Sequence, residues 1–173
     1  MDAKKNILFL CTGNSCRSQM AEGFARALRS DALTAYSAGV EKHGLNPRAV
    51  AVMAEAGVDI SGQASKLVSE LPDVAFNYVV TLCGSAHDLC PFFPGPVKKV
   101  HVGFEDPPAL AALAATEEEA LGHYRRVRDA IREFVAGLPE NIESEEREAG
   151  RSFRPGERSP RYEPGTALTK QTG

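Results

Sequence analysis

The sequence predicts an α/β protein of three layers, with a central four-stranded parallel sheet flanked by helices. Short apolar runs alternate along the chain with segments whose apolar residues recur at helical spacing. The first of these runs is continuous rather than alternating, which is typical of a strand buried on both faces. Strands that alternate with helices form parallel sheets, and functional sites then form beyond the carboxyl ends of the strands.

The first half of the chain contains two such strand and helix pairs. The apolar run 6–10 is the first expected strand, and a turn-prone segment leads from it into a helix expected at 18–28. A second strand is expected at 32–37. Asn46 is predicted to cap the N-terminus of a helix at 47–56, because its side chain can accept hydrogen bonds from the first backbone N–H groups.

The second half supplies the remaining strands and the last packed helix. Strands are expected at 74–82 and 98–102, because both runs are rich in β-branched and apolar residues. The helix expected at 116–138 is amphipathic, with charges on most of its surface. Its apolar face consists of Leu121, Tyr124, Val127, Ile131, Phe134 and Val135.

The composition changes after Pro139, and this change sets the predicted domain boundary. Residues 1–139 are predicted to form one domain, whose length can bury a core without disulfides or metals. Residues 140–173 are rich in Glu, Arg, Pro, Gly and Ser and have almost no apolar periodicity. They are predicted to be a disordered charged tail, with a partner-binding segment as the alternative.

The net charge of −3 argues against nucleic acid or an anionic membrane as a partner. No apolar stretch approaches the length of a membrane span, and the N-terminus does not resemble a signal peptide. We therefore expect a cytoplasmic protein, with a monomer as the default. In that compartment the four cysteines should be thiols that serve reactivity or metal binding rather than structural disulfides.

The loop from Cys11 to Ser18 is the strongest candidate site. It joins a buried strand to a helix N-terminus, so its backbone N–H groups and the helix dipole can hold a tetrahedral oxyanion. Arg17 can bind two oxygens of that anion. The predicted binding residues are Thr12, Gly13, Asn14, Ser15, Cys16, Arg17 and Ser18.

Cys11 is the predicted nucleophile of this loop, because the field that binds an anion also lowers the pKa of a thiol at its entrance. We expect Ser18 to donate a hydrogen bond to the Cys11 sulfur, and Gly13 to adopt backbone torsions that other residues avoid. The alternative interpretation is a buried structural cysteine followed by a surface arginine. The strand before the loop and the helix after it favour the functional interpretation.

An attack on an oxyanion needs a group that protonates the departing oxygen. Asp106 is the predicted general acid, since Pro107 restricts it to extended conformations and stiffens its loop. Glu105 is the competing carboxylate, and an ordinary turn aspartate is the alternative interpretation for Asp106.

Cys83 follows a predicted strand and precedes Cys90 by seven residues. A zinc site is the weaker hypothesis even with His87 between them, because the spacing is not that of a chelating pair. In the redox hypothesis Cys83 attacks the sulfur of an adduct on Cys11, and Cys90 then attacks Cys83. If 83–90 were helical, the two Cα atoms would lie about 10 Å apart. Because a disulfide tolerates at most about 7 Å, the segment would have to unwind.

Together these residues resemble the thioredoxin-coupled arsenate reductases, which have the fold of low-molecular-weight protein tyrosine phosphatases. The resemblance covers about residues 5–138. It rests on Cys-Thr-Gly-Asn-Ser-Cys-Arg-Ser at 11–18 with Gln-Met-Ala-Glu-Gly at 19–23, Tyr-Ser-Ala-Gly at 36–39, Val-Thr-Leu-Cys at 80–83 with Cys90-Pro91, and Gly-Phe-Glu-Asp-Pro at 103–107.

The resemblance implies that Cys11 attacks arsenate, which is bound by Arg17 and the loop amides, with Asp106 as the general acid. Cys83 would then displace arsenite by forming a disulfide with Cys11, and Cys90 would complete the relay. Thioredoxin would reduce the disulfide between Cys83 and Cys90, with glutaredoxin or a small thiol as the alternative electron donor. No metal or other cofactor is implied.

Two further expectations come from comparing the residues with the family pattern. Cys16 is expected to have a structural role outside the relay. Some family members bind potassium beside the loop, and three of the ligands match Asn14, Glu22 and Ser37, but the fourth position is Lys66. A lysine ammonium would replace the metal, so we expect no dependence on potassium.

Two other functions share most of these residues. A low-molecular-weight protein tyrosine phosphatase would use Cys11, Arg17, Ser18 and Asp106, but it has no need of two relay thiols. Pro108 also replaces the aromatic residue that such a phosphatase usually places after Asp-Pro, although weak phosphatase activity is expected. A non-catalytic oxyanion or redox sensor is the other alternative, and a general acid argues against it.

Overall fold

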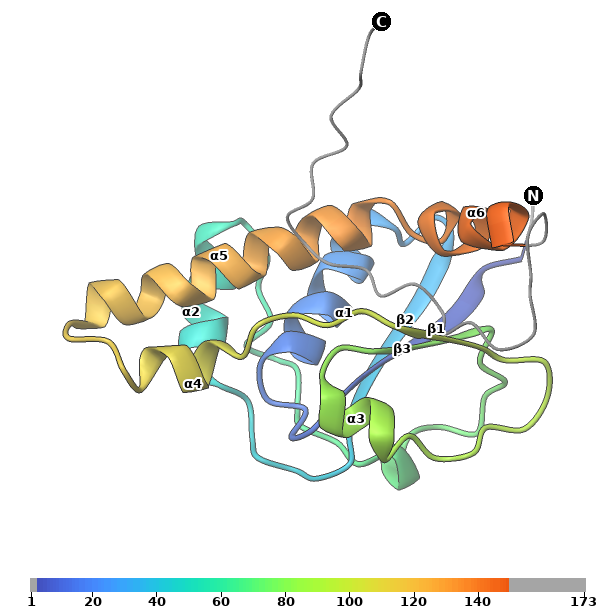
Figure 1. Cartoon of the computed structure of the whole chain (residues 1–173), viewed down its shortest axis with the longest axis horizontal. Helices are drawn as coiled ribbons and strands as arrows, with labels where there is room; N and C mark the ends of the chain where they lie inside the picture. Colours follow the sequence, from blue (N-terminus) through green and yellow to red (C-terminus); the bar gives the residue numbers. More distant parts are fainter. Residues whose placement is uncertain (1–2, 150–173) are drawn as a thin grey trace, which may run out of the picture.

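The computed structural model describes residues 3–149 of the chain (Figure 1). Its sheet contains β1 (Lys5–Cys11), β2 (Leu33–Gly39), β3 (Tyr78–Thr81) and β4 (Lys98–His101) in the order β2-β1-β3-β4. All three pairs of neighbouring strands are parallel. The predicted fold class, a four-stranded parallel sheet flanked by helices, is confirmed.

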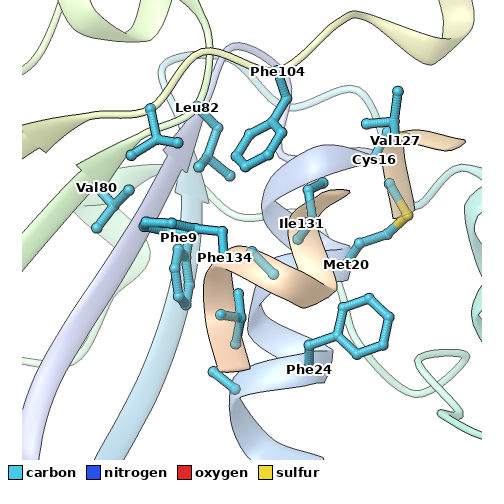
Figure 2. Packing of buried hydrophobic residues seen from close by; sticks show 14 of the residues in the cluster. Phe9, Cys16, Met20, Phe24, Val80, Leu82, Phe104, Val127, Ile131 and Phe134 are labelled. Carbon is cyan, nitrogen blue, oxygen red and sulfur yellow. The ribbon is translucent and has the colours of Figure 1, made fainter. Parts of the chain in front are cut away.

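Three helices cover one face of the sheet: α1 (Arg17–Leu28), α2 (Pro47–Glu55) and α5 (Glu117–Ala136). Figure 2 shows Phe9 of β1 beside Met20 of α1 and Ile131 of α5, all fully buried. The other face is covered by the short helix α3 (Gly84–Asp88) and by irregular segments that include the 3₁₀ turn Val68–Glu70. Two apolar clusters therefore enclose the sheet, as expected for strands without an alternating pattern.

The cap predicted at Asn46 is present, and α5 has a similar cap that was not predicted. The Asn46 side chain accepts hydrogen bonds from the backbone N–H groups of Arg48 and Ala49, at 2.9 and 3.2 Å. Thr116 accepts from the N–H of Glu119 in the same way at the start of α5. These side chains satisfy N–H groups that have no partner inside the helix, so they fix where each helix begins.

The third strand is shorter than predicted. Residues 74–77 lie outside β3: Asn77 donates one backbone hydrogen bond to the carbonyl of Asn6 at 2.9 Å, and two further bonds to β1 use side chains. Asn77 accepts a hydrogen bond from the N–H of Asn6 at 2.8 Å, and the Asn6 side chain donates to the carbonyl of Ala75 at 2.9 Å. A further short helix that was not predicted, α4 (Pro107–Ala111), packs against α5.

The predicted boundary at residue 139 is wrong, because a helix, α6 (Glu140–Ala149), follows it directly. Ile142 is only 2% exposed and belongs to the main apolar cluster. Lys5 of β1 donates to Glu143 at 2.7 Å and to the hydroxyl of Tyr78 at 2.9 Å. The domain thus includes at least the start of the predicted tail, and the rest of that tail, residues 150–173, lies outside the described residues.

Within residues 3–149 no helix combines the length and the apolar character needed to cross a membrane.

The contact of α6 with the core predicts a measurable loss of stability. We expect Ile142→Ala to lower the free energy of unfolding by about 2–4 kcal/mol, because it removes a buried side chain and leaves a cavity. Urea denaturation measures this change. The matched control is Leu113→Ala, at a position 86% exposed, which should change the free energy by no more than about 0.5 kcal/mol. Equal small effects at both positions would contradict the docking of α6.

Candidate active site

The loop predicted to bind an oxyanion lies between the end of β1 at Cys11 and the start of α1 at Arg17. It sits at the carboxyl edge of the sheet, where β1 is flanked by β2 and β3. All the predicted binding residues, 12–18, lie in this loop and in the first turn of α1. The structure therefore brings the predicted loop together as one continuous site.

Asn14 holds the loop in shape. It is fully buried and has a φ of 46°, a left-handed conformation that asparagine tolerates better than most residues. Its side-chain amide donates to the hydroxyls of Ser18 at 2.9 Å and Ser37 at 3.0 Å. Its side-chain oxygen accepts from the N–H of Lys66 at 2.8 Å. These bonds connect the loop to α1, β2 and the segment after α2.

Two expectations about the loop are corrected here. The residue with left-handed backbone torsions is Asn14 and not Gly13. Gly13 is required for lack of space, because an added Cβ would lie 2.2 Å from Nδ1 of His43. The described partner of the Ser18 hydroxyl is Asn14 and not the Cys11 sulfur. A backbone hydrogen bond at Thr12 stabilises the Cys11 thiolate in its place.

Gly39 is a site residue that belongs to the Tyr-Ser-Ala-Gly motif at 36–39 but was predicted to have no role of its own. A Cβ at this position would lie 2.7 Å from the carbonyl oxygen of Thr12 and 2.8 Å from the backbone nitrogen of Asn14. Neither backbone atom can move away without distorting the loop, so Gly39 allows β2 to approach it. A glycine near the end of a strand does not by itself predict a site residue. The register of the sheet, which places Gly39 opposite Cys11, shows that this glycine lies beside the loop.

Arg17 is positioned as expected for binding an anion. Its side chain is 11% exposed, and Nη1 donates to the carbonyl of Phe104 at 3.0 Å. Nη2 lies 3.4 Å from a carboxylate oxygen of Asp106. Nε is buried and has no hydrogen-bond partner among the described residues. A buried guanidinium N–H without a partner is costly, and an oxyanion in the loop would satisfy it.

The structure separates the two candidate acids. Asp106 lies at the N-terminal end of α4 next to Arg17, and 47% of its side chain is exposed. Glu105 instead forms an ion pair with Arg126 of α5 at 3.1 Å. This arrangement favours Asp106 as the group that faces the loop, and its role as the acid stays a prediction.

Cys83, the residue before α3, is in contact with Cys11. The two thiols lie in one buried cluster, and Cys83 bonds to the hydroxyl of Thr12 at 3.1 Å. The bond to Cys11 is the main reason that the pKa of Cys83 falls to about 5, with help from Thr12 and the N–H of Ala86. The same bond and burial raise the pKa of Cys11.

The two thiols titrate as a pair, and the low pKa expected for Cys11 itself stays a prediction. One proton of the pair is lost at a pKa lowered to about 5 and the other is retained, so the pair carries one negative charge at neutral pH. The sequence predicted that the loop lowers the pKa of a thiol. It did not predict that a second thiol, Cys83, shares the negative charge.

The other two cysteines have different environments. Cys16 is buried at the start of α1, and burial raises its pKa to about 12, which makes it unreactive and agrees with a structural role. Cys90 is half-buried, lies beyond α3, and contacts the carbonyl of Pro91 with its sulfur at 3.7 Å. All four cysteines are free thiols.

Helix α3 lies between Cys83 and Cys90. Part of this segment is therefore helical, which is the case in which a disulfide between the two cysteines requires unwinding. The ring of His87 on α3 packs against that of His101 on β4, with centroids 4.6 Å apart and the planes tilted by 42°. Among the described residues, no group of three or more His, Cys, Asp or Glu side chains could hold a metal ion.

Lys66 lies beside the loop, where the resemblance placed a tethered cation. Its ammonium is 3.7 Å from the carboxylate of Glu22 and donates to the carbonyl of Ala64 at 2.9 Å. Glu22 is buried and also accepts a hydrogen bond from Ser37. The charge of this carboxylate is therefore balanced from within the chain, and independence from potassium stays a prediction.

The family described as low molecular weight phosphotyrosine protein phosphatase matches residues 6–148. The chain belongs to this family. The match extends through most of α6, which agrees with the corrected domain boundary.

Its similar relatives within the family are arsenate reductases. The chain is 52% identical over 143 residues to the arsenate reductase of Bacillus licheniformis, covering 82% of this chain and 99% of that protein. It is 54% identical over 129 residues to the arsenate reductase of Bacillus subtilis, covering 73% and 89%.

Solved structures show the same fold. An arsenate reductase in the oxidized state matches with a TM-score of 0.66 and 33% identity, covering 80% of this chain and 98% of that one. A low molecular weight protein tyrosine phosphatase from T. tengcongensis matches with a TM-score of 0.62 and 27% identity, covering 80% and 99%. A thioredoxin-dependent arsenate reductase of Corynebacterium glutamicum, at 23% identity and a TM-score of 0.60, shares the fold; the match covers 83% of this chain and 64% of that one.

The shared proton of Cys11 and Cys83 predicts how the thiols of this family member titrate. Because the pKa of Cys83 is lowered to about 5, we expect one thiolate at neutral pH that is lost as the pH falls through about 5. Ultraviolet absorbance of the thiolate measures this titration. In Cys11→Ala, the main cause of the lowering is absent, so the midpoint should move upward.

Cys16→Ala is the matched control and should leave that midpoint unchanged, because the buried Cys16 thiol stays protonated. A wild-type midpoint near the ordinary thiol pKa of about 8.5, with no change in Cys11→Ala, would contradict the pairing.

Proposed function

We propose that this chain reduces arsenate to arsenite through a relay of Cys11, Cys83 and Cys90, and that thioredoxin restores the thiols. The observation that carries this proposal is the position of Cys83 beside the loop, where it bonds to the Thr12 hydroxyl at 3.1 Å and lies in one buried cluster with Cys11. A second thiol in contact with the nucleophile is what an oxidative mechanism requires. The relatives named as arsenate reductases support the substrate.

In the first step the loop amides and Arg17 bind the arsenate oxygens, and the unpaired Nε of Arg17 gains a partner. Cys11 attacks arsenic as its proton passes to the neighbouring Cys83 thiolate. An arsenic–sulfur bond forms, an arsenic–oxygen bond breaks, and Asp106 protonates the departing oxygen, which leaves as water.

In the second step Cys83 attacks the sulfur of Cys11 and releases its proton. The sulfur–sulfur bond forms, and the electron pair of the arsenic–sulfur bond stays on arsenic, which leaves as arsenite. Two thiols are oxidised to one disulfide while arsenic(V) is reduced to arsenic(III), so the electrons balance. The contact between the two sulfurs supports this step, because little movement is needed.

In the third step Cys90 attacks Cys83 and releases the Cys11 thiolate. Because α3 lies between Cys83 and Cys90, it has to unwind, and its packing against His101 is lost. The disulfide then lies between Cys83 and Cys90, where thioredoxin reduces it by exchange. The loop is left with all its thiols reduced for the next arsenate.

Phosphatase activity is the second candidate function, favoured by the family itself and by the geometry of Cys11, Arg17 and Asp106. Phosphate and arsenate have the same shape and charge, so the loop should accept both. A phosphatase releases its product with water and does not need Cys83 beside the nucleophile. We therefore propose weak phosphatase activity as a secondary property.

Removing the proposed acid should impair chemistry more than binding. We expect Asp106→Ala to lower the turnover of arsenate by about 10²–10⁴-fold, because general acid catalysis contributes that much. Initial rates of arsenite formation measure turnover, and competition with inorganic phosphate measures binding, which should be largely retained. Glu105→Ala is the matched control with near wild-type turnover, because Glu105 is tied to Arg126. Unchanged turnover in Asp106→Ala would overturn the assignment.

The relay predicts which thiols sustained turnover requires. With thioredoxin, thioredoxin reductase and NADPH, we expect arsenate-dependent NADPH oxidation in the wild type. It should be lost in single Ser variants of Cys11, Cys83 and Cys90 and kept in Cys16→Ser. NADPH oxidation that survives in Cys90→Ser would rule out the third step as proposed.

A further inference from the structure

The surroundings of Cys90 contain a cation that the proposed relay does not yet use. Lys99, on β4, donates from its ammonium to the carbonyl oxygen of Pro91 at 3.2 Å. The sulfur of Cys90 contacts the same oxygen at 3.7 Å. One backbone carbonyl thus has the resolving thiol on one side and an ammonium on the other.

A second contact fixes Lys99 over this segment. Its ammonium lies 5.7 Å from the centre of the Phe93 ring, within the range of a cation–π interaction. Phe93 is buried and packs edge-on against Phe76 at 5.8 Å. Lys99 is exposed, and these two contacts hold its ammonium against the segment that follows Cys90.

The charge of Lys99 acts on Cys90. Burial raises the pKa of the Cys90 thiol, and the ammonium of Lys99 opposes that effect. The titratable side chains just before Cys90 are His87, which packs against His101, and the exposed Asp88. Among the described residues, Lys99 is the charged group that lowers the pKa of this thiol.

We propose that Lys99 is a positioning residue that stabilises the thiolate of Cys90 for its attack on Cys83, an inference that rests on the proposed relay. Cys90 gives its proton to solvent, and its thiolate forms a bond with the Cys83 sulfur. The bond between Cys83 and Cys11 breaks, and Cys11 leaves as a thiolate. The exchange moves no net electrons, so it needs no external oxidant or reductant, and once α3 has unwound its rate depends on the thiolate of Cys90.

The variants that test this role keep the aliphatic stem and change the charge. Lys99→Met removes the ammonium, and Lys99→Arg keeps a cation. Lys98→Met is the matched control on the same strand, because Lys98 contacts Ile142 of α6 rather than the segment after Cys90. Thermal unfolding of each full-length variant checks that all are folded.

The first measurement is the alkylation rate of Cys90 against pH, followed by mass spectrometry of the peptide that contains it. We expect the profile of Lys99→Met to shift to higher pH and its rate near pH 7 to fall about twofold to fivefold, the size of an exposed charge interaction. Lys99→Arg and Lys98→Met should follow the wild type. An identical profile in Lys99→Met, or equal slowing in Lys99→Met and Lys99→Arg, would overturn the proposal.

The second measurement is a single turnover with arsenate and no reductant, quenched with acid. In Lys99→Met, arsenite should form as in the wild type, while the disulfide between Cys83 and Cys90 should form about twofold to fivefold more slowly. Equal rates would overturn the role of Lys99 in the exchange. A wild type that makes no such disulfide would instead refute the relay, and the alkylation profile would still decide whether Lys99 acts on Cys90.

Discussion

The parallel pairing of β1 with β3 is the constraint on which the site depends. Leu10 lies opposite Thr81, and the N–H of Leu82 continues the ladder to the carbonyl of Leu10 at 2.9 Å. The residues that follow, Cys11 and Cys83, therefore leave the sheet side by side, although 72 positions separate them. Sheet register alone brings the two thiols into contact, and all the chemistry proposed for the chain starts from that contact.

The loop around Cys11 is rigid because buried polar groups hold it from several elements. Asn14 connects it to Ser18 and Ser37. The buried carboxylate of Glu22 beside it pairs with Arg26 at 2.5 Å and with Lys66 at 3.7 Å. Such a network positions backbone N–H groups before an anion arrives, so that little reorganisation is needed. Rigidity here contrasts with α3, a helix of five residues that the relay requires to unwind.

Local sequence signals were sufficient for the parts of the site that follow from strand ends and helix starts. Cys11 and Cys83 were predicted to follow strands, and Asn46 was predicted as a cap, because each depends on its neighbours in sequence. The conformation of Asn14 and the role of Gly39 depend on contacts between separate elements, which no local pattern reveals. The proton shared by Cys11 and Cys83 was missed for the same reason.

The start of the predicted tail was also assigned wrongly because its contacts are with distant parts of the sequence. Its composition is polar, but Ile142 and Glu143 face partners at the other end of the chain, where Lys5 lies 138 positions away. A single buried isoleucine in a charged helix gives almost no periodic signal. Composition therefore placed the boundary ten residues before the end of α6.

The most direct test of the central claim, that Cys83 oxidises with Cys11 as arsenic is reduced, is to map disulfides after one turnover. Cys90→Ser would be mixed with equimolar arsenate and no reductant, then quenched, digested and analysed by mass spectrometry beside an assay for arsenite. The account predicts a disulfide between Cys11 and Cys83 and one arsenite released for each disulfide formed. Arsenite release with both thiols still free, or a disulfide that joins Cys11 to Cys16, would contradict it.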